Sequence, residues 1–137
     1  MLHSPRRRRG MHVVECAVVY PLVFLLLFGL LVGALGVFRY QEVASLAREG
    51  ARYASVRGRE YELRTGRPAA TADDVLNNAI APRAVILTPS QLGSSVTWNP
   101  DNQRGSTVTV TVTYQWVPEA YLGGLTLSST STTPMSY

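Results

Sequence analysis

Residues 39–56 read RYQEVASLAREGARYASV, and their apolar positions recur with the period of an α-helix. One arc of about 140° on the helical wheel holds only apolar or small side chains: Val43, Leu46, Ala47, Gly50, Ala51 and Ala54. The charged residues cluster on the opposite side: Glu42, Arg48, Glu49 and Arg52. Because the apolar arc consists of small residues, we expect the surface that covers it to approach the helix closely.

An uncharged run precedes this segment. Residues 16–38, CAVVYPLVFLLLFGLLVGALGVF, carry no charge, and as a helix they would be roughly 35 Å long, enough to cross a bilayer. A cleaved secretory signal is the alternative, since residues 34–36 are small, but the apolar part of such a signal is typically about 7–15 residues. We expect one helix, membrane-spanning over residues 11–38 and amphipathic over residues 39–57.

The remainder, residues 58–137, is predicted to be an exported α+β domain. Residues 58–70 contain mixed charges, glycine and proline, and indicate a loop. Thr71 and Asp74 hold the capping-box positions of a short helix that Pro82 ends.

The strand signals follow this helix. The clearest is residues 106–116, STVTVTVTYQW, in which apolar side chains alternate with threonines. The apolar side chains, from Val108 to Trp116, are expected to point one way and the threonines the other. Residues 84–87, 96–98 and 125–133 are further strand candidates. Covering the small-residue face of the helix with the valine face of the strand gives a two-layer unit. The predicted fold is therefore α+β, a long N-terminal helix packed on an antiparallel sheet of three or four strands.

Composition excludes several function classes. All 13 basic residues are arginine, four of them at residues 6–9, so that nine arginines balance nine acids from Met11 onward. A nucleic-acid footprint needs basic residues gathered on the folded domain, and we expect no nucleic-acid partner.

Catalytic chemistry also lacks its usual groups. After Cys16 the chain has no His, Cys or Lys, which excludes Cys/His nucleophiles, lysine Schiff bases and ordinary zinc sites from the exported part. The acidic pairs Glu60/Glu62 and Asp73/Asp74 are expected in a loop and at a helix start, respectively. We predict no enzyme, no cofactor and no metal.

The residues before the uncharged run form a further pattern. Glu15 stands at its entrance, where a charge costs on the order of 2–3 kcal/mol or more. A glycine, Gly10, lies five residues earlier, directly after the arginines of a basic leader, residues 1–10. This arrangement resembles the type IV prepilin leader, in which a membrane aspartic peptidase cuts after the glycine. The resemblance places the cut between Gly10 and Met11.

It also implies a role for the glutamate. Cleavage would create an α-ammonium group on Met11, and the Glu15 carboxylate would pair with that group on a neighbouring subunit, because a desolvated ion pair is favoured over an isolated buried charge. The alternative is an interfacial glutamate that stays among the lipid head groups.

Two longer segments make the resemblance more specific. Residues 14–21, VECAVVYP, look like the acidic-apolar-proline opening of the TadE-like family, and residues 46–54, LAREGARYA, closely resemble another segment of it. These are pseudopilin-like proteins of tight-adherence pilus systems. The chain departs from the family pattern at Cys16, where an aromatic residue is usual, and at residues 37–39, which replace an acidic-aromatic-glycine segment.

Other positions in the uncharged run have structural meaning. Pro21 removes a backbone donor and crowds the carbonyl of Ala17, so it is either a joint in the helix or a tolerated kink. Gly29 and Gly33 form a GxxxG pattern with Gly36 beyond it, which permits close helix packing.

The resemblance implies a non-catalytic minor pilin or pseudopilin of the bacterial inner membrane. Its expected partners are a prepilin peptidase, other pilin or pseudopilin subunits, the inner-membrane assembly platform and membrane lipid. Arginines flank the span on both sides, and the leader favours a cytoplasmic N-terminus with an extracytoplasmic C-terminal domain. The alternative is an uncleaved, single-pass anchored binding domain of unrelated role.

Overall fold

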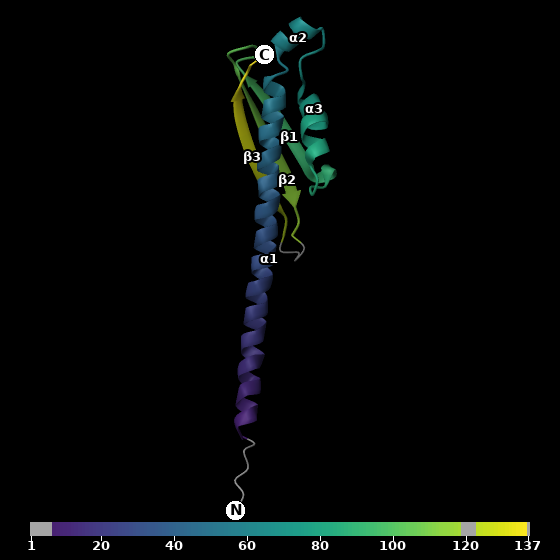
Figure 1. Cartoon of the computed structure of the whole chain (residues 1–137). Helices are drawn as coiled ribbons and strands as arrows, with labels where there is room; N and C mark the ends of the chain where they lie inside the picture. Colours follow the sequence, from purple (N-terminus) through teal and green to yellow (C-terminus); the bar gives the residue numbers. More distant parts are fainter. Residues whose placement is uncertain (1–6, 119–122, 137) are drawn as a thin grey trace, which may run out of the picture. The chain divides into compact units, whose positions relative to one another are not determined.

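The structure is a computed structural model that describes residues 7–118 and 123–136. Its main elements are, in order, α1 (Arg7–Ser55), α2 (Arg59–Thr65), α3 (Ala72–Val75), β1 (Leu92–Asn99), β2 (Thr107–Trp116) and β3 (Leu125–Pro134) (Figure 1). Short π and 3-10 turns, η1 (Leu76–Ile80), η2 (Ala81–Arg83) and η3 (Pro89–Gln91), connect α3 to β1. The chain divides into two units, Met1–Leu35 and Gly36–Tyr137.

The second unit has two layers, with the C-terminal part of α1 against the sheet. The small-residue face of the helix is buried: Val43, Leu46, Ala47, Ala51 and Ala54. The sheet contributes the apolar side chains of β2: Val108, Val110, Val112, Tyr114 and Trp116. A Cβ added at Gly50 would lie 3.1 Å from Val110 Cγ1 and 3.2 Å from Ile80 Cδ1. The helix therefore meets the sheet closely, and the predicted α+β fold is confirmed.

The sheet is antiparallel, with the strand order β1-β2-β3. Trp98 pairs with Val108 near one end of β2, and Leu125 pairs with Trp116 at the other. The threonines of β2 face away from the helix, and two of them meet threonines of β3 at 2.9 Å between hydroxyl oxygens: Thr109 with Thr132 and Thr111 with Thr130. The alternation of valine and threonine thus separates a core face from a hydroxyl face, as predicted.

The prediction of a strand at residues 84–87 is wrong. The backbone N–H groups of Val85 and Ile86 donate to Oε1 of Glu42, at 2.8 and 3.1 Å. A carboxylate from α1 thereby takes the donors that a neighbouring strand would need. Val85 is 86 % exposed, so the apolar composition of this segment reflects the burial of Leu87 and not a strand.

The prediction of a loop over residues 58–70 is also wrong, because α2 occupies Arg59–Thr65. Glu60 and Glu62 lie in its first turn, where a helix favours acids, and Glu60 pairs with Arg64 one turn later at 3.5 Å. Gly66 ends the helix in the left-handed region, with φ of 67°. The glycine that indicated a loop is the C-terminal cap of a short helix.

The predicted capping box of α3 is confirmed. Asp74 N–H donates to Thr71 Oγ1 at 3.2 Å, and Thr71 N–H donates to the Asp74 carboxylate at 3.0 Å. Beyond α3 the chain continues through η1 and η2, with Pro82 in the last turn. These turns place Ile80 in the core beside Gly50.

Acid is expected to weaken this cap. The backbone and hydroxyl hydrogen bonds from Thr71 lower the pKa of Asp74 below its ordinary value of 3.8. A carboxyl whose pKa is lower in the folded chain stabilises the fold fully above its unfolded pKa, and that stabilisation is lost as the pH falls through the folded pKa. Thr71→Ala should lower the free energy of unfolding by about 1 kcal/mol at neutral pH. Asp74→Asn should reduce the change in urea midpoint between about pH 6 and about pH 3.

The matched control is Asp73→Asn, since Asp73 is adjacent but lies outside the capping box. It should keep the acid sensitivity of the parent chain. An Asp74→Asn chain that is as sensitive to acid as the Asp73→Asn chain would contradict the assignment.

Candidate functional site

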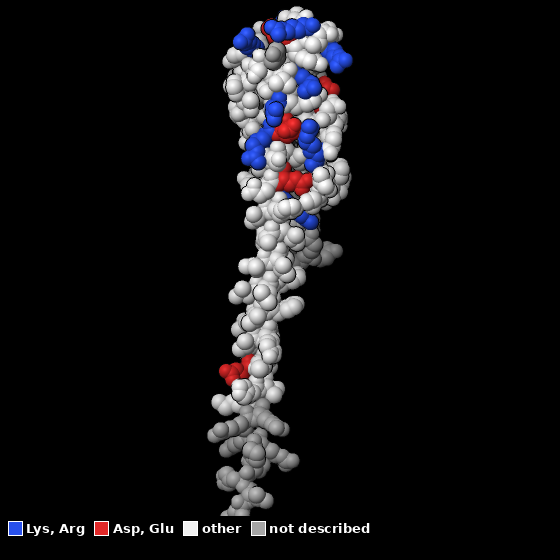
Figure 2. Space-filling view, viewed as in Figure 1, with Lys and Arg blue, Asp and Glu red and all other residues white. Residues whose placement is uncertain are grey.

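The candidate site begins in the first turns of α1. Gly10 and Met11 are helical, and the Glu15 side chain is 70 % exposed. His12 Nδ1 lies 3.9 Å from Glu15 Oε2, which is too long for a hydrogen bond. Among the side chains that the structure describes, none donates a hydrogen bond to this carboxylate. Figure 2 shows one acidic group on the long helical stretch, at a distance from the charged side chains of the second unit.

The predicted cleavage position lies inside the helix of the uncut chain. Helix α1 begins at Arg7, upstream of the bond between Gly10 and Met11. Glycine is less favourable in a helix than alanine by about 1 kcal/mol. Gly10 therefore lowers the intrinsic stability of the first turns of α1 at the predicted cleavage position.

The uncharged stretch is a candidate membrane anchor. Within the described residues, Met11–Ser55 is the segment long and apolar enough to cross a membrane. Its apolar side chains are exposed in this single chain, Leu25 by 72 % and Phe24 by 71 %. The helix runs through Pro21 without interruption. An open apolar surface surrounds this proline: Tyr20, Val23, Phe24 and Leu27.

The three predicted packing glycines have different surroundings. A Cβ added at Gly29 or Gly33 would meet nothing within 4 Å, so that face of the helix is open in this chain. A Cβ at Gly36 would lie 2.7 Å from Cζ3 of Trp116. Gly36 therefore makes room for an aromatic ring of the sheet. The role of Gly29 and Gly33 in helix packing stays a prediction.

The family model described as TadE-like protein matches residues 10–52. This segment of the chain is similar to TadE-like proteins. The match confirms the predicted resemblance and includes Gly10, Glu15, the uncharged run and most of the small-residue face. Comparisons with curated proteins and with solved structures gave no match. TadE-like proteins are associated with tight-adherence pili and are not known as enzymes.

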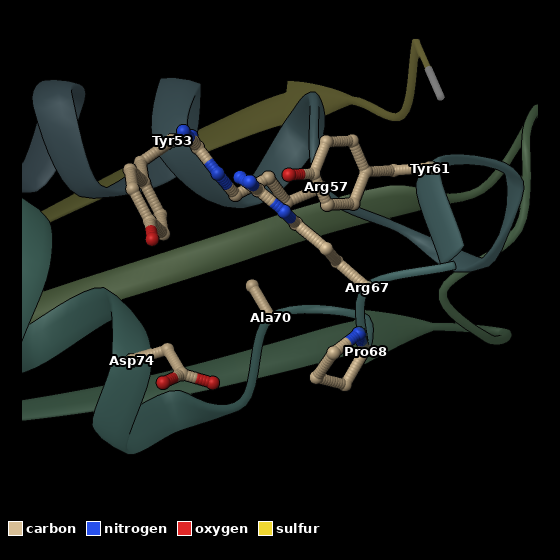
Figure 3. A pocket seen from close by; sticks show the side chains of 7 residues that line it. All are labelled: Tyr53, Arg57, Tyr61, Arg67, Pro68, Ala70 and Asp74. Carbon is tan, nitrogen blue, oxygen red and sulfur yellow. The ribbon is translucent and has the colours of Figure 1, made fainter. Parts of the chain in front are cut away.

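Beyond the TadE-like segment, the sequence did not reveal a pocket at the end of α1. Figure 3 shows the side chains that line it: Tyr53, Arg57, Tyr61, Arg67, Pro68, Ala70 and Asp74. The Arg57 guanidinium lies over two rings, 3.9 Å from the centroid of Tyr53 and 5.9 Å from that of Tyr61. These contacts hold α2 against the end of α1.

The same pocket contains a perturbed phenol. A hydrogen bond from Arg67 is the main reason that the pKa of Tyr61 is lowered, and the charge of Arg57 acts in the same direction. Asp74 supplies the pocket's carboxylate, but the capping box already engages it. The arginines and tyrosines of this pocket thus contact one another, and the carboxylate of Asp74 is already bonded to Thr71.

A second cluster that the sequence did not reveal involves Trp116. The Arg39 guanidinium lies 5.2 Å from its ring centroid, and the ring edge contacts Gly36. Its side chain was correctly predicted to face the helix, because it shares the parity of Val108 and Val110. The turn of the helix that Trp116 contacts depends on how the strand packs on the helix. A local sequence pattern does not determine this packing.

Proposed function

We propose that this chain is a minor pilin-like or pseudopilin-like, non-catalytic component of a tight-adherence pilus assembly and secretion system. The observation that carries the proposal is the TadE-like match over residues 10–52, which includes both the predicted cleavage position and Glu15. The apolar stretch of α1 supports a single-pass anchor in the inner membrane. The N-terminus would be cytoplasmic, and the unit from Gly36 onward extracytoplasmic, with a prepilin peptidase, other subunits and the assembly platform as partners.

The environment of Glu15 supports an intermolecular role. An exposed carboxylate at the entrance of an apolar helix is costly in lipid. His12, at 3.9 Å, is too distant to satisfy it by a hydrogen bond. A neighbouring subunit that brings its Met11 α-ammonium would supply a charged donor at the same depth. Incorporation into an assembly then compensates for the cost of the charge.

The surface of the second unit is compatible with a binding and assembly role. Basic and acidic side chains are interspersed on the face that Figure 2 shows. The ion pairs Glu49–Arg83, at 3.3 Å, and Glu60–Arg64, at 3.5 Å, join charges of opposite sign. Such mixed charge favours contacts with other protein subunits over a nucleic acid.

Mass spectrometry of the membrane-extracted protein tests the proposal. We expect the mature chain to begin at Met11 when it is expressed with its peptidase, whereas Gly10→Leu should retain Met1 because the peptidase site is blocked. The matched control is Gly29→Leu, which changes a glycine of the same helix far from the cut and should be processed normally. An intact Met1 on parent chain that is incorporated into pili would overturn the proposal and favour the uncleaved anchored domain.

A further inference from the structure

Strand β2 ends against α1 where the uncharged run of the helix ends. Phe38 is the last residue of that run, and Arg39 is its first following charge. The Trp116 ring contacts Gly36 and lies beneath the Arg39 guanidinium. Arg39 follows Gly36 by three positions, a helical rise of about 4.5 Å. One end of the sheet is therefore fixed within one helical turn of the boundary between apolar and charged sequence.

The same region of the second unit exposes apolar side chains. Leu125, the cross-strand partner of Trp116, is 53 % exposed, and Val117, which follows β2, is 51 % exposed. On the helix, Phe38 is 58 % and Tyr40 is 46 % exposed. Aromatic residues are enriched at both interfaces of a membrane, where a ring can be partly in hydrocarbon and partly among head groups.

The charge next to these side chains limits their depth. Arg39 can bury its aliphatic part but must keep its guanidinium at the level of the head groups. Because the Trp116 ring lies against this arginine and against Gly36, the end of the sheet shares that depth. The head-group region of a bilayer provides a polar environment for the Arg39 guanidinium and an apolar one for the exposed side chains beside it.

We propose that Phe38, Tyr40, Val117 and Leu125, called the boundary surface because they lie near the level of Trp116, rest in the head-group region of the phospholipid bilayer that α1 spans. The inference rests on α1 being a membrane anchor and does not depend on pilus assembly. The sheet would be held at the membrane surface by one end, with Trp116 joining strand to helix. The lipid contact would then orient the extracytoplasmic unit for its partners.

Fluorescence quenching in vesicles tests this inference, because the chain has 2 tryptophans. Trp98 pairs with Val108, eight residues along β2 from Trp116, a separation of about 26 Å at strand rise. The full chain is reconstituted into phosphatidylcholine and phosphatidylglycerol vesicles that contain lipid brominated near the head-group end of its acyl chains. Trp98→Phe leaves Trp116 as the reporter, and Trp116→Phe leaves Trp98.

We expect several-fold stronger quenching of Trp116 than of Trp98, and weaker quenching of Trp116 when the bromines lie near the bilayer centre. Equal quenching of the two tryptophans, or none of Trp116 in chain that floats with the vesicles, would overturn the inference and leave the anchor and the proposed function intact. A chain that no longer floats would overturn the anchor on which both depend.

A pair of surface variants separates lipid contact from simple proximity. In the Trp98→Phe background, Leu125→Asp places a charge on the boundary surface and should reduce the quenching of Trp116. Leu63→Asp is the matched control, since Leu63 is a 76 % exposed apolar residue of α2, which is joined to the opposite end of the sheet through the bond from Arg59 N–H to Asn102 O. Identical quenching in the two variants would show that the surface does not contact lipid.

Discussion

Gly50→Leu is expected to unfold the two-layer unit or to destabilise it severely. At this position a single added carbon would lie 3.1 Å from Val110 and 3.2 Å from Ile80. The larger leucine side chain has no room to enter without moving the helix away from β2. Overpacking by a few methylene groups typically costs about 1–3 kcal/mol, so a whole side chain should cost at least about 3 kcal/mol and lower the Tm by roughly 12 °C or more.

Thermal unfolding of the full chain in detergent, followed by the near-ultraviolet circular dichroism of its tryptophans, measures this effect. Gly29→Leu is the matched control, because a side chain at that glycine of the same helix meets open space in this chain, and its Tm should stay close to that of the parent. Gly50→Ala should fall between the two, since improved helix propensity offsets part of the crowding. Equal melting temperatures for Gly50→Leu and Gly29→Leu would show that helix and sheet do not approach as described.

Glu15→Ala is expected to abolish incorporation of the subunit into surface filaments without changing its amount in the membrane. If Glu15 pairs with the Met11 α-ammonium of a neighbour, truncation leaves that ammonium unpartnered in a desolvated place. Removing one member of such a pair costs about 3–5 kcal/mol, which corresponds to at least about a 100-fold loss in docking affinity. Immunoblots of sheared filaments and of membranes from the same cells, in a strain that lacks the native copy, provide the measurement.

Three further variants make the result specific. Glu15→Asp keeps the charge and should restore part of the incorporation, whereas Glu15→Gln keeps the shape without the charge and should not. His12→Ala removes the nearest described side chain that could carry a positive charge and should assemble normally. Full incorporation of the Glu15→Ala chain would remove the intermolecular pairing from the proposal.

Elements with a strong local period could be predicted from the sequence. The apolar arc of residues 39–56 repeats every three to four residues, and β2 alternates strictly, so each carries its own burial pattern. Thr71 and Asp74 are three residues apart and bond to each other's backbone N–H groups. The capping box could therefore be predicted from the sequence as well. In these cases the residues that interact are close in sequence or share one periodic face.

The errors have a common physical origin in contacts between distant residues. The Glu42 carboxylate accepts a hydrogen bond from the backbone of Val85, 43 positions away. This contact holds residues 84–87 in a turn, where their apolar composition had indicated a strand. Similarly, the backbone N–H of Arg59 donates to the carbonyl of Asn102 at 3.0 Å, 43 positions along the chain, and this contact helps to hold α2, whose seven residues are marginal as an isolated helix. The side chain of Trp116 was assigned to the correct face, but its contact with Gly36 depends on the docking of whole elements.

Most of the candidate site at the start of α1 could be predicted from the sequence. Gly10, Met11 and Glu15 are close together in the chain, and their resemblance to a prepilin leader rests on their spacing, the arginines before them and the uncharged run after them. The structure adds that the Glu15 carboxylate is exposed and not hydrogen-bonded to a described side chain. If the carboxylate pairs with the Met11 α-ammonium of a neighbour, as proposed, its partner belongs to a second molecule, which one chain cannot show.

The threonine pairs between β2 and β3 also bear on solubility. Strand β3 is an edge of the sheet, and an edge with free main-chain groups is a template for uncontrolled pairing between chains. Its outward side chains are short hydroxyls that already bond to β2, so a second copy joining there would bury little hydrocarbon and form no dry, interdigitated interface. If the chain is stored in the membrane as a pilus subunit, as proposed, crowded copies would therefore find little hydrocarbon on this strand with which to stack in an amyloid-like manner.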